Sequence, residues 1–220
     1  MDIVIVGAGG HGRVVLDILR ASNLHRPVAF IDADPALAGS RVGGVPVAGQ
    51  ANLLPKLRSQ KVKGAIIAIG DNRARVRYAR MAAEQGFELI NAIHPSAVVS
   101  PTAKLGQNIV IAAGAVIGTD AELSDSVLVN TSAVIDHECR IGEGAHLCPA
   151  AALAGRVRVG DGAFVGLGCR VIQCLSVGAH ATIGAGSVVI RDVPADATVV
   201  GVPARVIKIA ATEAAGVGRV

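Results

Sequence analysis

The sequence LSDSVLVNTSAVIDHECRI, residues 123–141, carries an aliphatic residue at every sixth position. The same spacing extends from Val99 to Val189, and all sixteen successive positions are Val, Ile or Leu. The fourth residue after each is usually small or β-branched, as in Ala115 and Ala133. A helix repeats every 3.6 residues and a flat strand every two, whereas six residues let a short strand end at a corner with one aliphatic side chain inward. The hexads therefore predict a parallel β-solenoid.

Three hexads form one triangular coil, so residues eighteen apart should stack at about the ordinary strand spacing of 4.8 Å. On this map Gly155 lies one coil above His137. Two neighbouring columns consist mostly of small residues, and they contain Thr131, Pro149, Leu167 and Ala185 in one and Asn130, Cys148, Gly166 and Gly184 in the other. Such columns leave room for a long, thin ligand along the solenoid axis.

The chain begins with a predicted strand, a glycine turn and a helix. The apolar run Asp2–Val6 is followed by the pattern GxGxxG at Gly7, Gly9 and Gly12 and by an amphipathic stretch over residues 13–21. Glycine lets backbone N–H groups approach a phosphate at a helix N-terminus, where the helix dipole favours negative charge. The pattern also occurs in purely structural turns, so it favours nucleotide binding without establishing it.

Two further predicted strands, residues 28–31 and 65–69, end in polar loops, Asp32-Ala33-Asp34 and Gly70-Asp71-Asn72-Arg73. The carboxyl ends of parallel strands meet at one edge of a sheet, so both loops should lie beside the glycine turn. A helix over residues 73–85 and a strand over 87–91 complete the unit. It is half of a dinucleotide fold, with room for a mononucleotide and hardly for NAD.

His94-Pro95 marks a boundary, because the residue before proline leaves the helical region and the hexads follow directly. We therefore expect a Rossmann-like half domain over residues 1–93, a solenoid over 94–194, and a C-terminal capping segment and tail over 195–220. The last residues, 210–220, should fray.

Composition excludes several classes of protein. The hydrophobic fraction is 51%, but no apolar run approaches the ~18 residues of a spanning helix, and Asp2 begins a strand pattern where a leader would stand. We expect a cytoplasmic protein without a membrane span. A net charge of +4 with no Trp, one Tyr and three Phe disfavours nucleic acid and favours small polyanionic ligands. The four cysteines include no CxxC pair, and Cys139 and Cys169 occupy inward positions, so we expect them to pack.

The segment Asp136-His137-Glu138 departs most clearly from the repeat, because it places three ionisable side chains in a row. Because Ile135 and Cys139 point inward, His137 should face outward. A neighbouring carboxylate orients an imidazole and makes it a better base, which suits proton abstraction near neutral pH. The alternative is an ordinary charged surface.

A zinc site is disfavoured. His146 and His180, the other solenoid histidines, occupy different positions in the coil from His137 and from each other.

Several ordered motifs together resemble a known family. They are GAGGHG (7–12), AIGDN (68–72), IHPSAVVSP (93–101), NTSAVIDHECRIGEGAHL (130–147) and DVPADATVVGVPARVIK (192–208). The chain is similar over residues 1 to about 208 to the hexapeptide-repeat sugar O- and N-acetyltransferases, which include sialic acid O-acetyltransferases. Its motifs are most similar to those of the UDP-4-amino-sugar N-acetyltransferases of the bacillosamine pathway, with the GDP-perosamine N-acetyltransferases close behind.

The resemblance implies a left-handed parallel β-helix that assembles as a homotrimer with active sites between subunits. It implies that His137 is the general base and that Glu138 raises its basicity. We further expect Asp136, on the other side of His137, to help to hold the imidazole. It assigns five residues to acetyl-CoA, namely His146, Asn130, Gly155, Leu167 and Ala185. It assigns nucleotide-sugar binding to Gly9, Gly10, His11, Asp32, Gly70 and Arg73. At Ala33, which belongs to the same site, a relative has a second acidic residue. Asp34 could take the role of that acid.

The expected function is therefore N-acetylation, by acetyl-CoA, of the 4-amino group of a nucleotide-linked 4-amino-4,6-dideoxy sugar. A UDP-sugar is the first choice, and no metal is required. O-acetylation of sialic acid or a related sugar, GDP-perosamine N-acetylation and a non-catalytic trimeric scaffold remain alternatives. A nucleotidyltransferase would need a larger N-terminal domain, and an NAD-dependent oxidoreductase has only GxGxxG in its favour.

Overall fold

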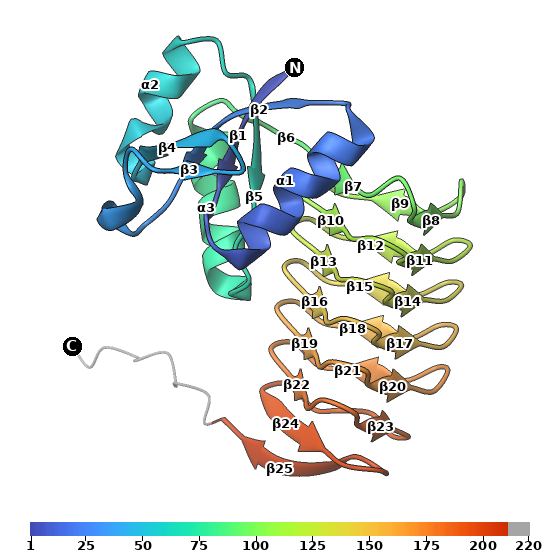
Figure 1. Ribbon diagram of the computed structural model, residues 1–220. Helices are drawn as coiled ribbons and strands as arrows, with labels where there is room; N and C mark the ends of the chain where they lie inside the picture. Colours follow the sequence, from blue (N-terminus) through green and yellow to red (C-terminus); the bar gives the residue numbers. More distant parts are fainter. Residues whose placement is uncertain (211–220) are drawn as a thin grey trace, which may run out of the picture.

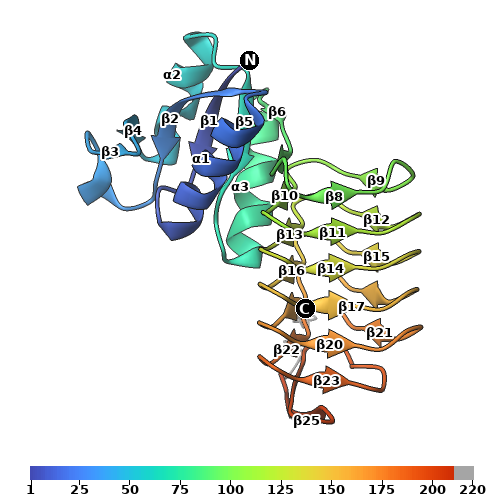
Figure 2. The same ribbon diagram turned by 45° about the vertical axis from the view of Figure 1, so that its right-hand side comes forward.

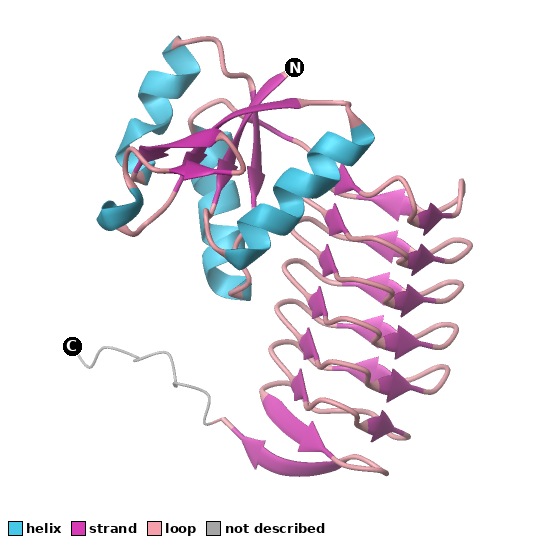
Figure 3. Ribbon diagram, viewed as in Figure 1, coloured by secondary structure: helices cyan, strands magenta, loops and turns pink. Residues whose placement is uncertain are grey.

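The computed structural model describes residues 1–210, in which an α/β domain packs beside the first coils of a β-solenoid (Figure 1; Figure 3). The tail expected to fray lies outside the described residues, apart from Ala210. None of the helices in residues 1–210 is both long and apolar enough to cross a membrane.

The N-terminal domain is a six-stranded sheet in the order β3-β4-β2-β1-β5-β6. Its strands are parallel except for the β3–β4 hairpin. The strands are β1 (Asp2–Val6), β2 (Arg26–Ile31), β3 (Arg41–Val42), β4 (Val45–Gly49), β5 (Gly64–Ile67) and β6 (Glu88–Leu89). The helices are α1 (Gly10–Ser22), α2 (Leu54–Ser59) and α3 (Asn72–Glu84), with 3-10 turns η1 (Pro35–Leu37) and η2 (Ala51–Leu53).

This order places the reversal of strand connection at β1, which is where ligands bind in open α/β sheets. The expected strand Asp2–Val6 is β1, and α1 starts at Gly10 because the glycine turn itself forms the first helical turn. The hairpin β3–β4 and helix α2 were not expected from the sequence. The expected strand over residues 87–91 is only Glu88–Leu89, since the Asn91 side chain already bonds the solenoid at Gly106 and Ile109.

The solenoid consists of two-residue strands arranged in three parallel sheets. Sheet one contains β7 (Ala92–Ile93), β10 (Val110–Ile111), β13 (Leu128–Val129), β16 (His146–Leu147), β19 (Phe164–Val165) and β22 (Thr182–Ile183). Sheet two contains β8 (Val98–Val99), β11 (Val116–Ile117), β14 (Val134–Ile135), β17 (Ala152–Leu153), β20 (Arg170–Val171) and β23 (Val188–Val189). Sheet three contains β9 (Lys104–Leu105), β12 (Glu122–Leu123), β15 (Arg140–Ile141), β18 (Arg158–Val159) and β21 (Ser176–Val177).

Residues eighteen apart pair throughout, as Val134 pairs with Ala152. Two details differ from expectation. The solenoid begins two residues before residue 94, because Ala92–Ile93 already pairs with β10. It ends in β24 (Ala197–Val200), which pairs with β22, and in β25 (Arg205–Ile209), which runs antiparallel to β24.

The solenoid core is formed by the inward hexad residues and the small residues between them. Ile135 and Ala133 are fully buried, and so are Cys139 and Cys169, which confirms that these two thiols pack in the core. The three outer faces differ. Sheet three is polar, with Lys104, Glu122, Arg140, Arg158 and Ser176 pointing outward, whereas sheet two is mostly apolar, with Val98, Val116, Val134, Ala152 and Val188.

Helix α1 lies between the N-terminal sheet and sheet one of the solenoid (Figure 1), and Figure 2 shows helix α3 beside the same sheet. Leu16 and Leu19 of this helix share a core with Ile5 on one side and with Val110 and Leu128 on the other. Because this core is continuous, the two parts of the chain hold a fixed relation to each other.

Candidate active site

The glycine turn leaves an open, electropositive helix end. Gly7 has a φ of 110°, and a side chain at Gly12 would begin 2.1 Å from the Gly7 carbonyl oxygen, so both glycines are needed for the turn itself. By contrast, nothing lies within 4 Å of where side chains at Gly9 and Gly10 would begin. No side chain caps α1 at Gly9, and its first turn has no acidic residue. Free N–H groups and an unopposed dipole therefore face solvent, where a phosphate can approach.

A small pocket of about 190 Å³ lies at the carboxyl ends of β1, β2 and β5. Gly7, Asp32 and Ala33 line it, as expected. The other lining residues are Val6, Ile31, Ala51, Ile69 and Tyr78. The Asp32 carboxylate braces the turn, because it accepts hydrogen bonds from the N–H of Ala8 (2.7 Å) and of Asp34 (2.9 Å). Asp34 instead caps η1 through the N–H of Ala36.

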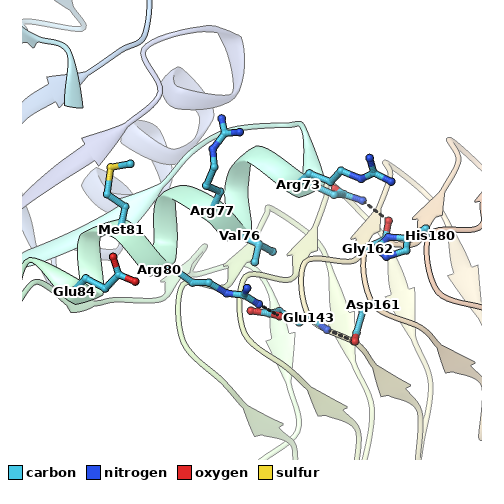
Figure 4. A pocket seen from close by; sticks show the side chains of 11 residues that line it. Arg73, Val76, Arg77, Arg80, Met81, Glu84, Glu143, Asp161, Gly162 and His180 are labelled. Carbon is cyan, nitrogen blue, oxygen red and sulfur yellow. Dashed lines mark hydrogen bonds and ion pairs between the residues drawn. The ribbon is translucent and has the colours of Figure 1, made fainter. Parts of the chain in front are cut away.

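The third loop contributes differently from expectation. Gly70 is open to solvent at its α-carbon, but the arginine of α3 that reaches its carbonyl oxygen is Arg75, at 3.2 Å. Arg73 lines a separate cleft of about 610 Å³ between α3 and the solenoid turns. In Figure 4 it points toward the end of this cleft at which His180 lies, while Arg80 pairs with Glu143 (2.8 Å). Arg73 is therefore placed outside the pocket that contains Asp32.

His11 and His146 lie near each other where the glycine turn meets the solenoid. His146, on β16, is 8% exposed and lies edge-on to Phe164, with ring centroids 5.1 Å apart. Its Nε2 is 3.4 Å from the Asn130 amide, whereas His146 Nδ1 and His11 Nε2 are buried without a partner. Burial, followed by the charge of Arg75, lowers the pKa of His11 to about 4 and of His146 to about 3. Both rings are neutral near pH 7, with polar atoms available to a ligand.

His137 lies at the turn between β14 and β15. Its Nδ1 is 2.9 Å from Glu138 Oε2, and its side chain is 46% exposed, so the expected outward orientation is confirmed. A proton on Nδ1 donated to this carboxylate leaves Nε2 as the basic atom. A side chain at Gly155 would begin 2.4 Å from Nε2, so the imidazole lies directly against this glycine. Asp136 does not reach the ring, because its carboxylate accepts the backbone N–H of His137 at 2.7 Å.

The expected coenzyme column lies at the turns between sheets one and two. Leu167 is 55% exposed and Ala185 is exposed one coil further along. Gly166 is buried beneath this surface, and a side chain there would begin 2.4 Å from the Ile183 carbonyl oxygen.

Within one chain, the candidate site residues fall into two separate groups. His11, His146 and Asn130 lie on or beside sheet one, next to the N-terminal domain. His137, Glu138 and Gly155 lie at the corner between sheets two and three, which in a triangular coil is opposite sheet one. Within residues 1–210 no group of three His, Cys, Asp or Glu side chains is arranged to hold a metal ion.

The low pKa of His146 predicts a specific pH dependence of stability. An unfolded histidine titrates near pH 6.5, so below that pH the unfolded state binds more protons and the free energy of unfolding decreases toward pH 3. We expect His146→Leu to reduce the slope of this free energy against pH by up to about 1.4 kcal/mol per unit. Urea unfolding between pH 4 and 7 measures the slope. A slope for His146→Leu equal to that of the wild type would contradict the assignment.

Comparison with known proteins gives consistent results. Residues 2–82 match the family model of the PglD N-terminal domain. PerB from Caulobacter crescentus, solved with CoA and GDP-perosamine, is 48% identical with a TM-score of 0.90, over 94% of this chain and 98% of that one. The acetyltransferase domain of PglB from Neisseria gonorrhoeae, solved with acetyl coenzyme A, is 38% identical with a TM-score of 0.87, over 94% and 98%.

A curated UDP-N-acetylbacillosamine N-acetyltransferase from Bacillus subtilis is 37% identical over 117 residues. The chain spans about half the length of the curated relatives that it matches. The near-complete structural matches confirm the family resemblance and the expected fold, a Rossmann-like half domain followed by a left-handed parallel β-helix. The chain belongs to the family of acetyl-CoA-dependent sugar N-acetyltransferases.

Proposed function

We propose that this protein transfers the acetyl group of acetyl-CoA to the 4-amino group of a nucleotide-linked 4-amino-4,6-dideoxy sugar. The observation that carries the proposal is the neighbourhood of His11 and His146. His11 belongs to the open glycine turn, and His146 belongs to the solenoid face beside Asn130. A sugar diphosphate held at the glycine turn would therefore direct its sugar toward the solenoid, where the coenzyme column begins.

The identity of the nucleotide is the finer part of the proposal. The motifs alone favour a UDP-sugar. The relative with 48% identity was solved with GDP-perosamine, whereas the identities to the PglB domain and the B. subtilis enzyme are 38% and 37%. We therefore place a GDP-linked amino sugar first and a UDP-linked one second.

In the proposed mechanism, the sugar amine attacks the thioester carbonyl carbon directly. The N–C bond forms, the C–S bond breaks, and Nε2 of His137 accepts the proton that the amine loses. Glu138 stabilises the imidazolium through Nδ1. The N–H of Gly155 stabilises the oxyanion, for which one such donor can contribute ~3 kcal/mol. Glycine is suited to this position because a side chain there would begin 2.4 Å from Nε2 and would displace the His137 ring.

The division of the site supports sites shared between subunits, as in the homotrimer that the family resemblance implies. An acceptor bound at the glycine turn lies beside sheet one, and His137 of the same chain lies at the opposite corner. Sheet two joins the two halves, since one of its edges carries the coenzyme column and the other carries His137. Its outward valines, including Val98 at 62% exposure, form an apolar surface that a second copy would cover. In such an assembly the two halves come from different chains.

A thiol-release assay tests the function. With acetyl-CoA present, we expect GDP- or UDP-linked 4-amino sugars to release free CoA and free sialic acid to release none. A 4-hydroxy analogue of the reactive nucleotide-sugar is the matched control, because it differs only in the nucleophile. Acetylation of sialic acid without any reaction of the nucleotide-sugars would favour the O-acetyltransferase alternative, and no thiol release from any acceptor would favour the scaffold.

His137→Ala should reduce kcat by about 10² to 10⁴, the usual contribution of a general base. The KM for acetyl-CoA should change little, because the ring touches the reacting centre and not the coenzyme column. Gln173→Ala, at the exposed position one coil beyond Gly155, is the control for a surface change at this corner. If His137→Ala retained full turnover across pH 6 to 9, another proton acceptor would have to be assigned.

Subunit complementation tests the shared site. His137→Ala and His146→Ala should each have low activity alone. When the two variants are refolded together, random assembly should restore about a quarter of wild-type activity, because that fraction of sites pairs two unaltered halves. Activity that never exceeds the mean of the two separate variants would place the whole site in one chain.

A further inference from the structure

Arg75 is a fully buried cation at the junction of the two domains. All five of its N–H groups have oxygen partners. Nη1 donates to the carbonyls of Ile69 (3.0 Å) and Gly70 (3.2 Å), and Nε donates to the carbonyl of Ser126 (2.8 Å). Nη2 donates to Asn72 Oδ1 (2.9 Å) and to the carbonyl of Gly144 (2.8 Å). A single planar side chain therefore connects the loop that follows β5 with two successive coils of the solenoid.

The solenoid atoms in these contacts belong to one column. Asn108, Ser126, Gly144 and Gly162 are each eighteen residues apart, so they stack along one corner of the coil. The N–H of Ile67 donates to Asn108 Oδ1 (2.8 Å), Arg75 donates to the next two positions, and Asn72 Nδ2 donates to the Gly162 carbonyl (3.0 Å). The segment from Ile67 to Arg75 is thus attached at four successive levels, which together span about 14 Å.

The chemistry of this contact requires arginine. Burial lowers the pKa of Arg75 to about 10, so the group stays charged near pH 7, and carbonyl dipoles supply its partners. A buried charge of this kind is costly unless every donor is satisfied. Lysine has three donors in a tetrahedral arrangement and cannot reproduce a planar fork to five oxygens.

The two sides of the junction differ in rigidity. The coil that contains Gly144 and Ala145 is held by the parallel ladder, in which the N–H of His146 donates to the Ala163 carbonyl. The acceptor loop over residues 68–71 is held by fewer ladder hydrogen bonds. The N–H of Ala68 donates to the Val6 carbonyl, and Gly70 is open to solvent. Loss of the guanidinium would therefore remove the attachment of Ile69 and Gly70 to the solenoid, while Asp71 stays bonded to the start of α3 and the coil stays in place.

We infer that Arg75 is a positioning residue, which fixes the acceptor loop at Ile69 and Gly70 in register with the coil that carries His146. This inference rests on the proposed function, because it assigns Gly70 to the nucleotide-sugar and His146 to the coenzyme. The spacing of the stacked column would then set the distance between the two substrates.

The kinetic test uses Arg75→Lys and Arg75→Met. Arg80→Lys and Arg80→Met are the controls, because Arg80 also joins α3 to the solenoid but does so through an exposed ion pair with Glu143. We expect the KM for the nucleotide-sugar to rise about tenfold or more in both Arg75 variants, because the acceptor loop is no longer held. The KM for acetyl-CoA should stay within about twofold, and the Arg80 variants should resemble wild type. A lower kcat with both KM values unchanged would show only a smaller folded fraction and would overturn the inference, as would equal shifts in the two KM values.

Hydrogen exchange provides a readout that does not depend on activity. In the folded Arg75→Lys protein, amides of residues 68–72 should exchange faster, while amides of the solenoid strands keep their wild-type rates. Unchanged exchange in the loop would overturn the positioning role whether or not the protein acetylates any sugar, whereas failure of the wild-type assay alone would overturn only the proposed function. If the Met variant does not fold, Asn72→Ala removes the outermost attachment and should accelerate exchange in the same loop.

Discussion

The parallel hydrogen bonding of residues eighteen apart is the constraint on which the rest of the structure depends. It requires an aliphatic residue at each hexad and a small one between, because three sides meet around a narrow core. It also fixes every distance along the outside of the solenoid. The same repeat that places Gly155 against His137 places Phe164 beside His146 and aligns the column from Asn108 to Gly162. Core packing and site geometry are therefore two results of one periodicity.

Burial at the domain junction has opposite effects on the charge of the arginine and of the two histidines there. Arg75 keeps its charge because five oxygens surround it, and that charge in turn helps to keep His11 and His146 neutral. A neutral imidazole can form a hydrogen bond to a polar substrate without forming an ion pair with the phosphates of that substrate. His137 differs, since it is half exposed and bonded to Glu138. A carboxylate at that position is suited to a ring that must accept a proton.

Much of the fold could be predicted from the sequence because its repeats are local. The hexads and the coil map followed from counting, and the strand–turn–helix at the start followed from glycine spacing. The β3–β4 hairpin and helix α2 could not be predicted, because elements of two to six residues are too short to show a clear periodicity. Among the site residues, His137 and Glu138 are adjacent in sequence, and their contact was expected. Arg75 was not, because its partners lie up to 70 residues away and its sequence neighbours are also arginines.

Under the proposed function, the acceptor and the coenzyme would be recognised by different kinds of structure. The coenzyme is long and invariant, and a repeating surface such as the column through Leu167 and Ala185 can contact it at regular intervals. The proposed acceptor carries a base and a sugar that require specific contacts, and the pocket for it is lined by loops at strand ends, where Ala33 or Tyr78 can change without disturbing a repeat. Such loops would be too variable in position to direct a reaction by themselves. Their attachment to a stacked column at four levels gives them the regular spacing of the solenoid while leaving their ligand-facing side chains free to differ.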